Sequence, residues 1–287
     1  MGDFDDNSAG YGAPRDEGDA SAPPPGFGAP PLPGFAPPPP PPMFGGQPTF
    51  VAYGANPVVT VGAFQSASAL ATMIQIFLAF DAILLIVSAI QTIQDHGRLN
   101  DVFVTTGSTI EMRQAINSSS SVGGFLSLAI LGTIVVFIMW FYRSRRNAAA
   151  LGDRVEYSPG MAIGAWFIPL ANFVLPIQIA MGMWSPKTVP NRKSMLVPAL
   201  WWATFIVGPW VVIYGIGQMA FSVLDGLFFD QNAQYWHDRW ATGSAFVAVG
   251  DFILVASALL AVAFVRGVTA SHDSRFKAVT SSGQIAY

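Results

Sequence analysis

The sequence of 287 residues contains no cysteine, which excludes disulfides, thiolate metal sites and cysteine nucleophiles. Charge is scarce as well: Asp, Glu, Lys and Arg make up 11% of the chain, less than half the share usual in a soluble domain, while 52% of the residues are hydrophobic. The net charge of -3 leaves no basic domain for a polyanion, so nucleic acid is not an expected partner. This composition predicts a membrane protein.

Catalytic motifs are also missing. No Gly-x-Ser-x-Gly elbow, phosphate-binding loop or dinucleotide fingerprint occurs between a predicted strand and a helix. His96, His237 and His272 are expected in three separate loops, without the spacing of metal ligands. The sequence therefore predicts no enzymatic activity, no cofactor and no metal site.

The N-terminal 66 residues differ from the rest of the chain. Residues 22–42 are rich in proline and glycine and can bury too little apolar surface to offset the entropy of ordering, so we expect disorder with local polyproline II. Phe27 and Phe35 could dock in an aromatic groove of a protein partner, or the segment could be a solvated tether. We predict a disordered cytoplasmic tail over 1–66 and a short C-terminal tail over 278–287.

Four apolar stretches are long enough to cross a bilayer, whose hydrocarbon core of about 30 Å requires about 20 helical residues. The sequence thus predicts an all-α membrane domain over 67–277, with spans at 67–93, 122–142, 196–222 and 243–265. Tryptophans at the predicted cytoplasmic boundary, including Trp140 and Trp201, are interpreted as belts that anchor helix depth at the headgroups. A fifth apolar stretch over 161–184 contains two prolines, each of which removes a helical hydrogen bond.

The basic residues decide whether this fifth stretch spans. With four spans, 11 of the 14 Lys and Arg lie on the cytoplasmic side; with five, six lie inside and eight outside, which reverses the positive-inside bias. We therefore predict a multi-pass plasma-membrane protein with both termini cytoplasmic. Residues 158–184 then form a proline-broken interfacial or re-entrant segment, with Ser158 as N-cap and Pro159 at the first helical position.

The run from Trp140 to Trp184 carries a recognisable pattern, in which a basic helix end leads to a Ser-Pro-Gly turn and a proline-interrupted apolar sequence. It resembles an uncharacterised bacterial membrane family, domain of unknown function 4328, and the likeness extends over roughly 67–277. Met161, Leu175, Ile177 and Ser185 depart from the pattern. The resemblance implies a fold but no reaction, ligand or cofactor. The matching residues are Tyr142, Arg143, Arg146, Asn147, Ser158, Pro159, Gly160, Trp166, Phe167, Ile168, Pro169, Asn172, Pro176 and Gln178.

Two acidic residues lie inside predicted spans, Asp81 in the first and Asp251 in the fourth. A central aspartate costs about 2.5–3.5 kcal/mol on insertion scales, so each should face protein or water. They could share a proton or small cation, with Gln75 as a polar neighbour, or each could hydrogen-bond a hydroxyl or carbonyl of an adjacent helix. Asn172, between the two prolines, could satisfy carbonyls that the prolines free or could line a ligand cavity.

Two functional hypotheses follow. The first is a non-enzymatic membrane scaffold or interaction protein, with the lipid bilayer and a protein bound by the proline-rich tail as its partners. The alternative is a small proton- or cation-coupled transporter or channel subunit that uses Asp81 and Asp251. Its short four-span core would require a homo-oligomer.

Overall fold

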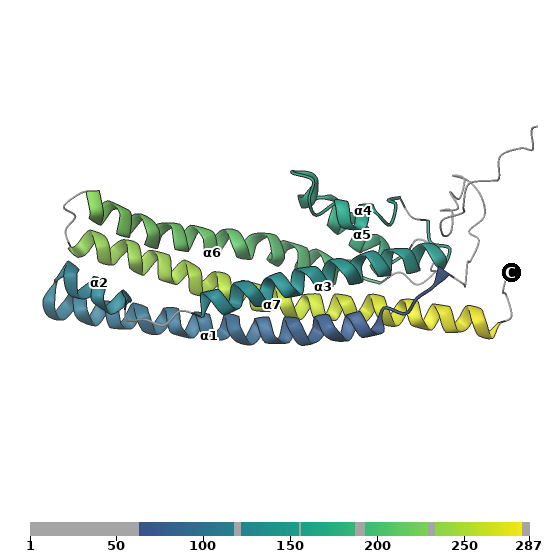
Figure 1. Cartoon of the computed structure of the whole chain (residues 1–287), viewed down its shortest axis with the longest axis horizontal. Coiled ribbons are helices and arrows are strands. Elements are labelled where there is room, and N and C mark those ends of the chain that lie inside the picture. Colours follow the sequence, from purple (N-terminus) through teal and green to yellow (C-terminus); the bar gives the residue numbers. More distant parts are fainter. Residues whose placement is uncertain (1–62, 118–121, 155, 187–192, 229–232, 283–287) are drawn as a thin grey trace, which may run out of the picture. The chain divides into compact units, whose positions relative to one another are not determined.

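The computed structural model describes residues 63–117, 122–154, 156–186, 193–228 and 233–282. The predicted tail lies outside these residues except for its last four, and so do residues 283–287. All regular secondary structure in the described part of the chain is helical (Figure 1).

Four long helices make up the fold: α1 (Ser68–Thr106), α3 (Gly123–Ala150), α6 (Leu196–Phe228) and α7 (Ala233–Ser281). Each contains one predicted span, to within one residue at the start of the span, and is long and apolar enough to cross a membrane. The prediction of an all-α membrane protein with four spanning helices is therefore confirmed. The helices continue past the predicted spans, and α7, with 49 residues, is about 73 Å long.

Shorter helices fill the connections: α2 (Thr109–Asn117), α4 (Met161–Gly164), the 3-10 turn η2 (Ala171–Phe173) and α5 (Leu175–Trp184). Helix α1 stops at Gly107, whose φ of 61° is left-handed and whose N–H donates to the Phe103 carbonyl. Met112 of α2 can then pack with Leu99 and Trp236 in a small core at one end of the bundle, which we call the outer end after the predicted topology.

The main core lies at the other end, which we call the inner end, and is largely aromatic. The rings of Trp201 and Phe264 stack with centroids 5.0 Å apart, and Trp140 Nε1 donates to Thr269 Oγ1 over 3.1 Å. Trp140 is fully buried and Trp201 is 3% exposed. The interpretation of these two tryptophans as headgroup belts is therefore wrong: they join helices to one another.

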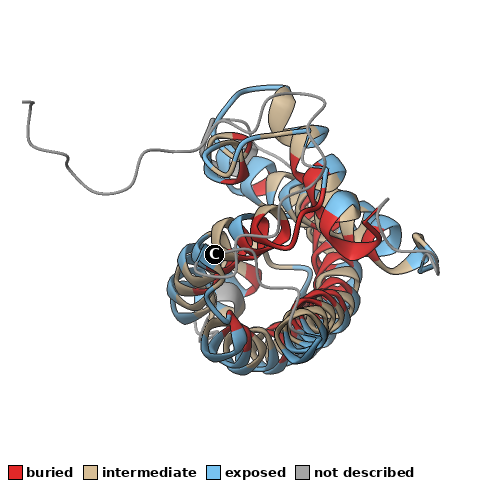
Figure 2. Cartoon of the chain, turned by 90° about the vertical axis from the view of Figure 1, so that its right-hand side faces the viewer, coloured by how far each residue is buried: buried red, intermediate tan, exposed pale blue. Residues whose placement is uncertain are grey.

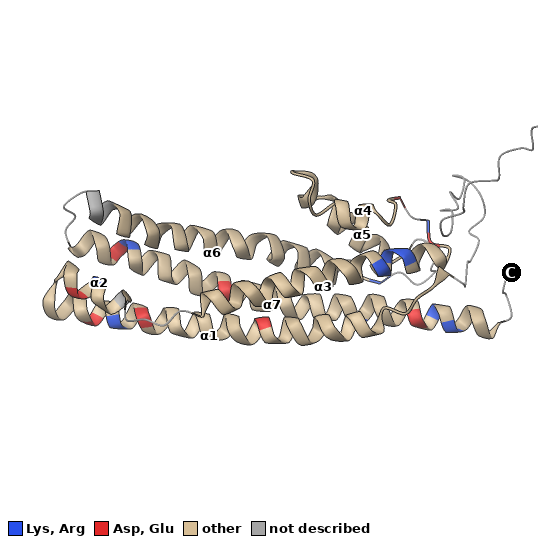
Figure 3. Cartoon of the chain, viewed as in Figure 1, with Lys and Arg blue, Asp and Glu red and all other residues tan. Residues whose placement is uncertain are grey.

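Apolar residues also cover the outside of the bundle. Ile76, Phe125, Leu128 and Leu259 are each more than 60% exposed, whereas the buried positions lie on helix sides that face one another (Figure 2). Lys and Arg gather toward the helix ends (Figure 3). An apolar surface this extensive suits lipid rather than water.

Glycines set the contact between α6 and α7. A Cβ on Gly215 would lie 2.6 Å from the Gly243 carbonyl oxygen, and one on Gly243 would lie 2.7 Å from the Gly215 carbonyl oxygen. About two helical turns further along α7, a Cβ on Gly250 would meet the Val212 nitrogen of α6 at 2.9 Å. Because lipid tails are as apolar as the side chains, helices in a bilayer depend on such close backbone packing.

Gly215→Ala should therefore destabilise the bundle by about 1–3 kcal/mol through overpacking against the backbone of α7. Gly217→Ala, on the same helix, is the matched control, because a Cβ there meets nothing within 4 Å. It should be neutral or stabilising by up to about 1 kcal/mol through helix propensity. Thermal unfolding of both variants in one detergent tests this, and equal melting temperatures would contradict it.

Candidate functional site

Both intramembrane aspartates are buried at helix contacts. Asp81 is 5% exposed, and its Oδ2 accepts a hydrogen bond from Thr133 Oγ1 of α3 over 2.6 Å. Asp251 is 3% exposed and is hydrogen-bonded to the Ser88 side chain of α1. Each carboxyl thus joins its helix to a neighbour through a hydroxyl group, as interhelical hydrogen bonds do in membranes.

The structure does not bring together the three residues predicted to share a proton or cation, Asp81, Asp251 and Gln75. Asp81 lies seven residues from Ser88, the partner of Asp251, which corresponds to about 10 Å along α1. Gln75 Nε2 donates to the Ala71 carbonyl of its own helix over 2.9 Å instead of reaching Asp81. The three residues therefore form separate contacts.

The inner end of α3 holds several polar residues of the recognised pattern. The Asn147 side chain pairs with both backbone groups of Gln65, accepting from its N–H over 3.1 Å and donating to its carbonyl over 2.7 Å. The Tyr142 ring lies beneath the Arg146 guanidinium, 5.9 Å from the ring centroid. Arg145, outside the pattern, is 3% exposed and donates twice to the Tyr157 carbonyl. These contacts tie α3 to the segments before α1 and before α4.

The Ser-Pro-Gly turn differs from its prediction. Helix α4 begins at Met161, its N-cap is Gly160, and no side chain caps it. The Ser158 carbonyl accepts the Met161 N–H over 3.0 Å, and Pro159 precedes the helix. The prediction of Ser158 as N-cap and Pro159 as first helical residue is therefore wrong by two positions, because the turn is closed by backbone rather than side-chain bonds.

The proline-broken segment packs along the spanning helices. Trp166 meets Phe137 of α3 and Phe205 of α6 edge to face, with centroids 5.8 and 6.0 Å apart. Trp202 Nε1 of α6 donates to the Phe173 carbonyl over 3.1 Å. Because Phe137, Trp202 and Phe205 all lie within predicted spans, this segment runs beside those spans rather than beyond their ends.

Local turns satisfy most of the backbone of this segment. Nearly every N–H from Met161 to Val174 donates to a carbonyl two to four residues earlier. Pro176 is buried in the first turn of α5, where a missing N–H costs nothing. Pro169 lies beside Leu170, the one non-glycine residue with a positive φ in the part of the chain that the structure describes; its φ is 64° and it is 81% exposed.

Asn172 and Gln178 have different environments. The Asn172 side-chain oxygen is buried without a hydrogen-bond partner among the described residues, and no described contact joins its amide to a carbonyl. The predicted repair of proline-freed carbonyls is therefore not seen. The Gln178 side-chain oxygen accepts the Tyr157 hydroxyl, which links α5 to the turn before α4.

A charged cluster at the inner end was not predicted from the sequence. Arg275 of α7 donates to both carboxylate oxygens of Asp153, at 2.7 and 2.9 Å. His272, one turn earlier, is 1% exposed, and neither ring nitrogen has a partner in the described part of the chain. Lys193 Nζ donates to the Gly267 carbonyl over 3.0 Å, and burial lowers the pKa of Lys193.

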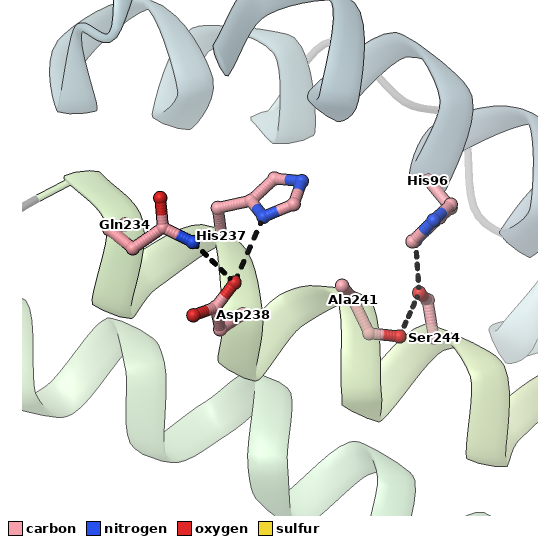
Figure 4. A network of polar contacts seen from close by, with 6 residues as sticks. All are labelled: His96, Gln234, His237, Asp238, Ala241 and Ser244. Atoms are coloured by element: carbon pink, nitrogen blue, oxygen red, sulfur yellow. Dashed lines mark hydrogen bonds and ion pairs between the residues drawn. The ribbon is translucent and has the colours of Figure 1, made fainter. Parts of the chain in front are cut away.

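The other two histidines lie at the outer end (Figure 4). His96 Nδ1 is 3.0 Å from Ser244 Oγ, and Ser244 Oγ also donates to the Ala241 carbonyl over 3.0 Å. His237 stacks on Phe103 and contacts Asp238. All three histidines are in helices α1 and α7, so their prediction as loop residues is wrong. The described residues contain no group of three ligands suited to a metal.

Comparison with known proteins identifies a family for this chain. A family model described as "Domain of unknown function (DUF4328)" matches residues 105–270, a shorter stretch than the 67–277 expected from the sequence, and leaves out nearly all of α1. No curated protein and no solved structure matches the chain. The match includes Asp251 and the whole proline-broken segment but not Asp81.

The bond between α1 and α3 can be tested by Thr133→Val, which keeps the side-chain shape and removes the donor to Asp81. We expect a loss of stability of about 0.6–1.7 kcal/mol, the range for hydrogen bonds between membrane helices. Thr204→Val is the control, because that hydroxyl bonds only carbonyls of its own helix. The measurement is reversible unfolding in mixed micelles, in a cycle with Asp81→Leu; additive effects would show that the two side chains do not interact.

Proposed function

We propose, from the premise that the chain belongs to the family of the domain of unknown function DUF4328, that it is a non-enzymatic scaffold of the plasma membrane. Its four helices anchor two interaction elements: the proline-rich tail and the segment over 158–184. The family description specifies no reaction, so the proposal is argued from the contacts of the described residues.

This proposal rests on the contacts that the two intramembrane carboxyl groups make. Asp81 and Asp251 each bond a hydroxyl of a neighbouring helix, and they are only 5% and 3% exposed. A transport site needs such groups in a cavity that water or substrate can reach. Interhelical bonding needs only the contacts that are seen.

The proline-broken segment supports an interaction role. It is held in place by Trp166 and by the Trp202 bond, yet it leaves Phe167 and Leu170 70% and 81% exposed. A rigid, irregular backbone with exposed apolar side chains beside spanning helices suits contact with another membrane-embedded chain or with a second copy of this protein. The tail, outside the described residues, would supply a further contact through Phe27 and Phe35.

A small proton- or cation-coupled transporter or channel subunit remains the second candidate. Asp81 Oδ1 and Asp251 Oδ2 are both buried without partners among the described residues. Such oxygens are sites at which a carboxyl can hold a proton. This observation favours the second candidate enough to require a direct test.

The proposed topology places both termini in the cytoplasm. Single cysteines at Gln114, Ser158, Ser194 and Ser274 use the absence of native cysteine. A membrane-impermeant maleimide applied to intact cells should label only the Gln114→Cys variant, in α2. Labelling of both Ser194→Cys and Ser274→Cys, but not of Ser158→Cys, would show that the broken segment spans the membrane.

The double variant Asp81→Asn with Asp251→Asn distinguishes a scaffold from a transporter. For a scaffold, proteoliposomes of the full chain should show no more proton or potassium flux than protein-free liposomes, and the double variant should retain every partner cross-linked in cells. Deletion of residues 1–60 should remove the partners that bind the tail.

Asp101→Asn, at an exposed position of α1, is the control for loss of an acidic residue. Flux that is present in the native chain, absent in the double variant and retained by Asp101→Asn would overturn the scaffold proposal in favour of the transporter. A deletion of residues 1–60 that leaves the cross-linked partners unchanged would remove the tail from the proposal.

A further inference from the structure

A pocket of about 180 Å³ opens between the residues before α1, the inner end of α3 and helix α4. Its α3 wall is formed by side chains that recur every three or four residues and so share one helix face. Leu70 and Ile163 complete the apolar part of the lining. The residues of the α3 wall are Ile138, Met139, Tyr142, Arg143, Arg146 and Asn147.

The polar rim of this pocket is positive. Arg143 and Arg146 both line it, none of the lining residues is acidic, and neither arginine has a carboxylate partner among the described residues. Arg145, between them in sequence, instead points inward to the Tyr157 carbonyl. The two rim arginines are therefore left available for an anion from outside the chain.

The backbone on the opposite side of the rim is fixed in place. Asn147 bonds both the N–H and the carbonyl of Gln65, which lines the pocket beside Ala63. These two bonds hold this stretch of chain against α3. The pocket thus has a prearranged wall rather than a gap between independent helices.

The apolar and charged parts of the pocket follow one another along the axis of α3. Ile138 and Met139 belong to the last turn of the predicted span 122–142, and Arg143 follows that span directly. From Ile138 to Arg146 the helix rises about 12 Å, the distance from the outer part of an acyl layer into the headgroups. Below Met139, Ile134 and Val135 continue an exposed apolar strip along α3.

We propose that this pocket is a specific site for one anionic phospholipid of the inner leaflet, with its phosphodiester at Arg143 and Arg146 and an acyl chain along Leu70, Ile138 and Met139. Guanidinium groups bind phosphate oxygens through paired N–H donors, which suits a phosphodiester better than a point charge does. A free phosphate ion would use the rim alone and leave the apolar walls unoccupied. Two positive charges without counter-charges select an anionic over a zwitterionic lipid.

Native mass spectrometry of the delipidated full chain, titrated with dioleoyl phosphatidylglycerol or dioleoyl phosphatidylcholine, tests this site. The native chain should retain one phosphatidylglycerol in preference to phosphatidylcholine. Arg143→Gln with Arg146→Gln should bind phosphatidylglycerol about thirtyfold more weakly, which corresponds to about 2 kcal/mol. Arg154→Gln with Arg266→Gln is the control, since it removes two exposed arginines that do not line the pocket.

Three results would overturn the proposal. Equal losses in the two double variants would show a general electrostatic attraction. Displacement of phosphatidylglycerol by an equal concentration of inorganic phosphate would show an anion site without lipid specificity. Unchanged binding by Ile138→Trp, which fills the apolar floor and keeps both arginines, would exclude the acyl contact. Because this variant retains every charge, it also tests the site if the glutamine variants fail to fold.

Discussion

The hydrocarbon layer offers no hydrogen-bond partner to a peptide group, and the rest of this structure follows from that constraint. Four helices satisfy it through their own backbone, with one interruption at Pro209 inside α6, which has no N–H to donate. The segment between α3 and α6 satisfies it in another way: tight turns pair its N–H groups, and an indole of α6 donates to the Phe173 carbonyl. An irregular backbone can therefore lie beside the spans because its polar groups find hydrogen-bond partners within the protein.

The same solvent removes the usual reason for helices to associate, since apolar side chains are as well placed in lipid as in a core. The bundle is instead held by close approach and by a few polar bonds. Gly215 and Gly243 bring α6 and α7 to backbone contact, Asp81 joins α1 to α3, and Asp251 joins α7 to α1. At the inner end, stacked aromatic rings and the Arg275–Asp153 pair add to these contacts.

The four spans could be predicted from the sequence because run length and apolarity are local properties. Features that depend on contacts between residues far apart in the sequence could not be predicted in this way. Trp140 and Trp201 are of the residue type that forms headgroup belts and lie near the ends of predicted spans, but only tertiary contacts show that they face other helices. His272 was expected in a loop because its surroundings are polar, yet α7 continues through it. The pairing of Asp81 with Thr133 required the register between two helices, which no single stretch of sequence contains.

The length of α7 has a mechanical consequence. It runs without a proline from Trp236 in the outer core to Arg275 in the inner charged cluster, so no missing N–H interrupts its backbone between the two. A rod of about 73 Å that pivots by five degrees at one end displaces the other by about 6 Å. The outer core and the inner charged cluster are thus joined by one continuous helix, so a tilt of α7 about Trp236 would displace the buried His272 at its other end.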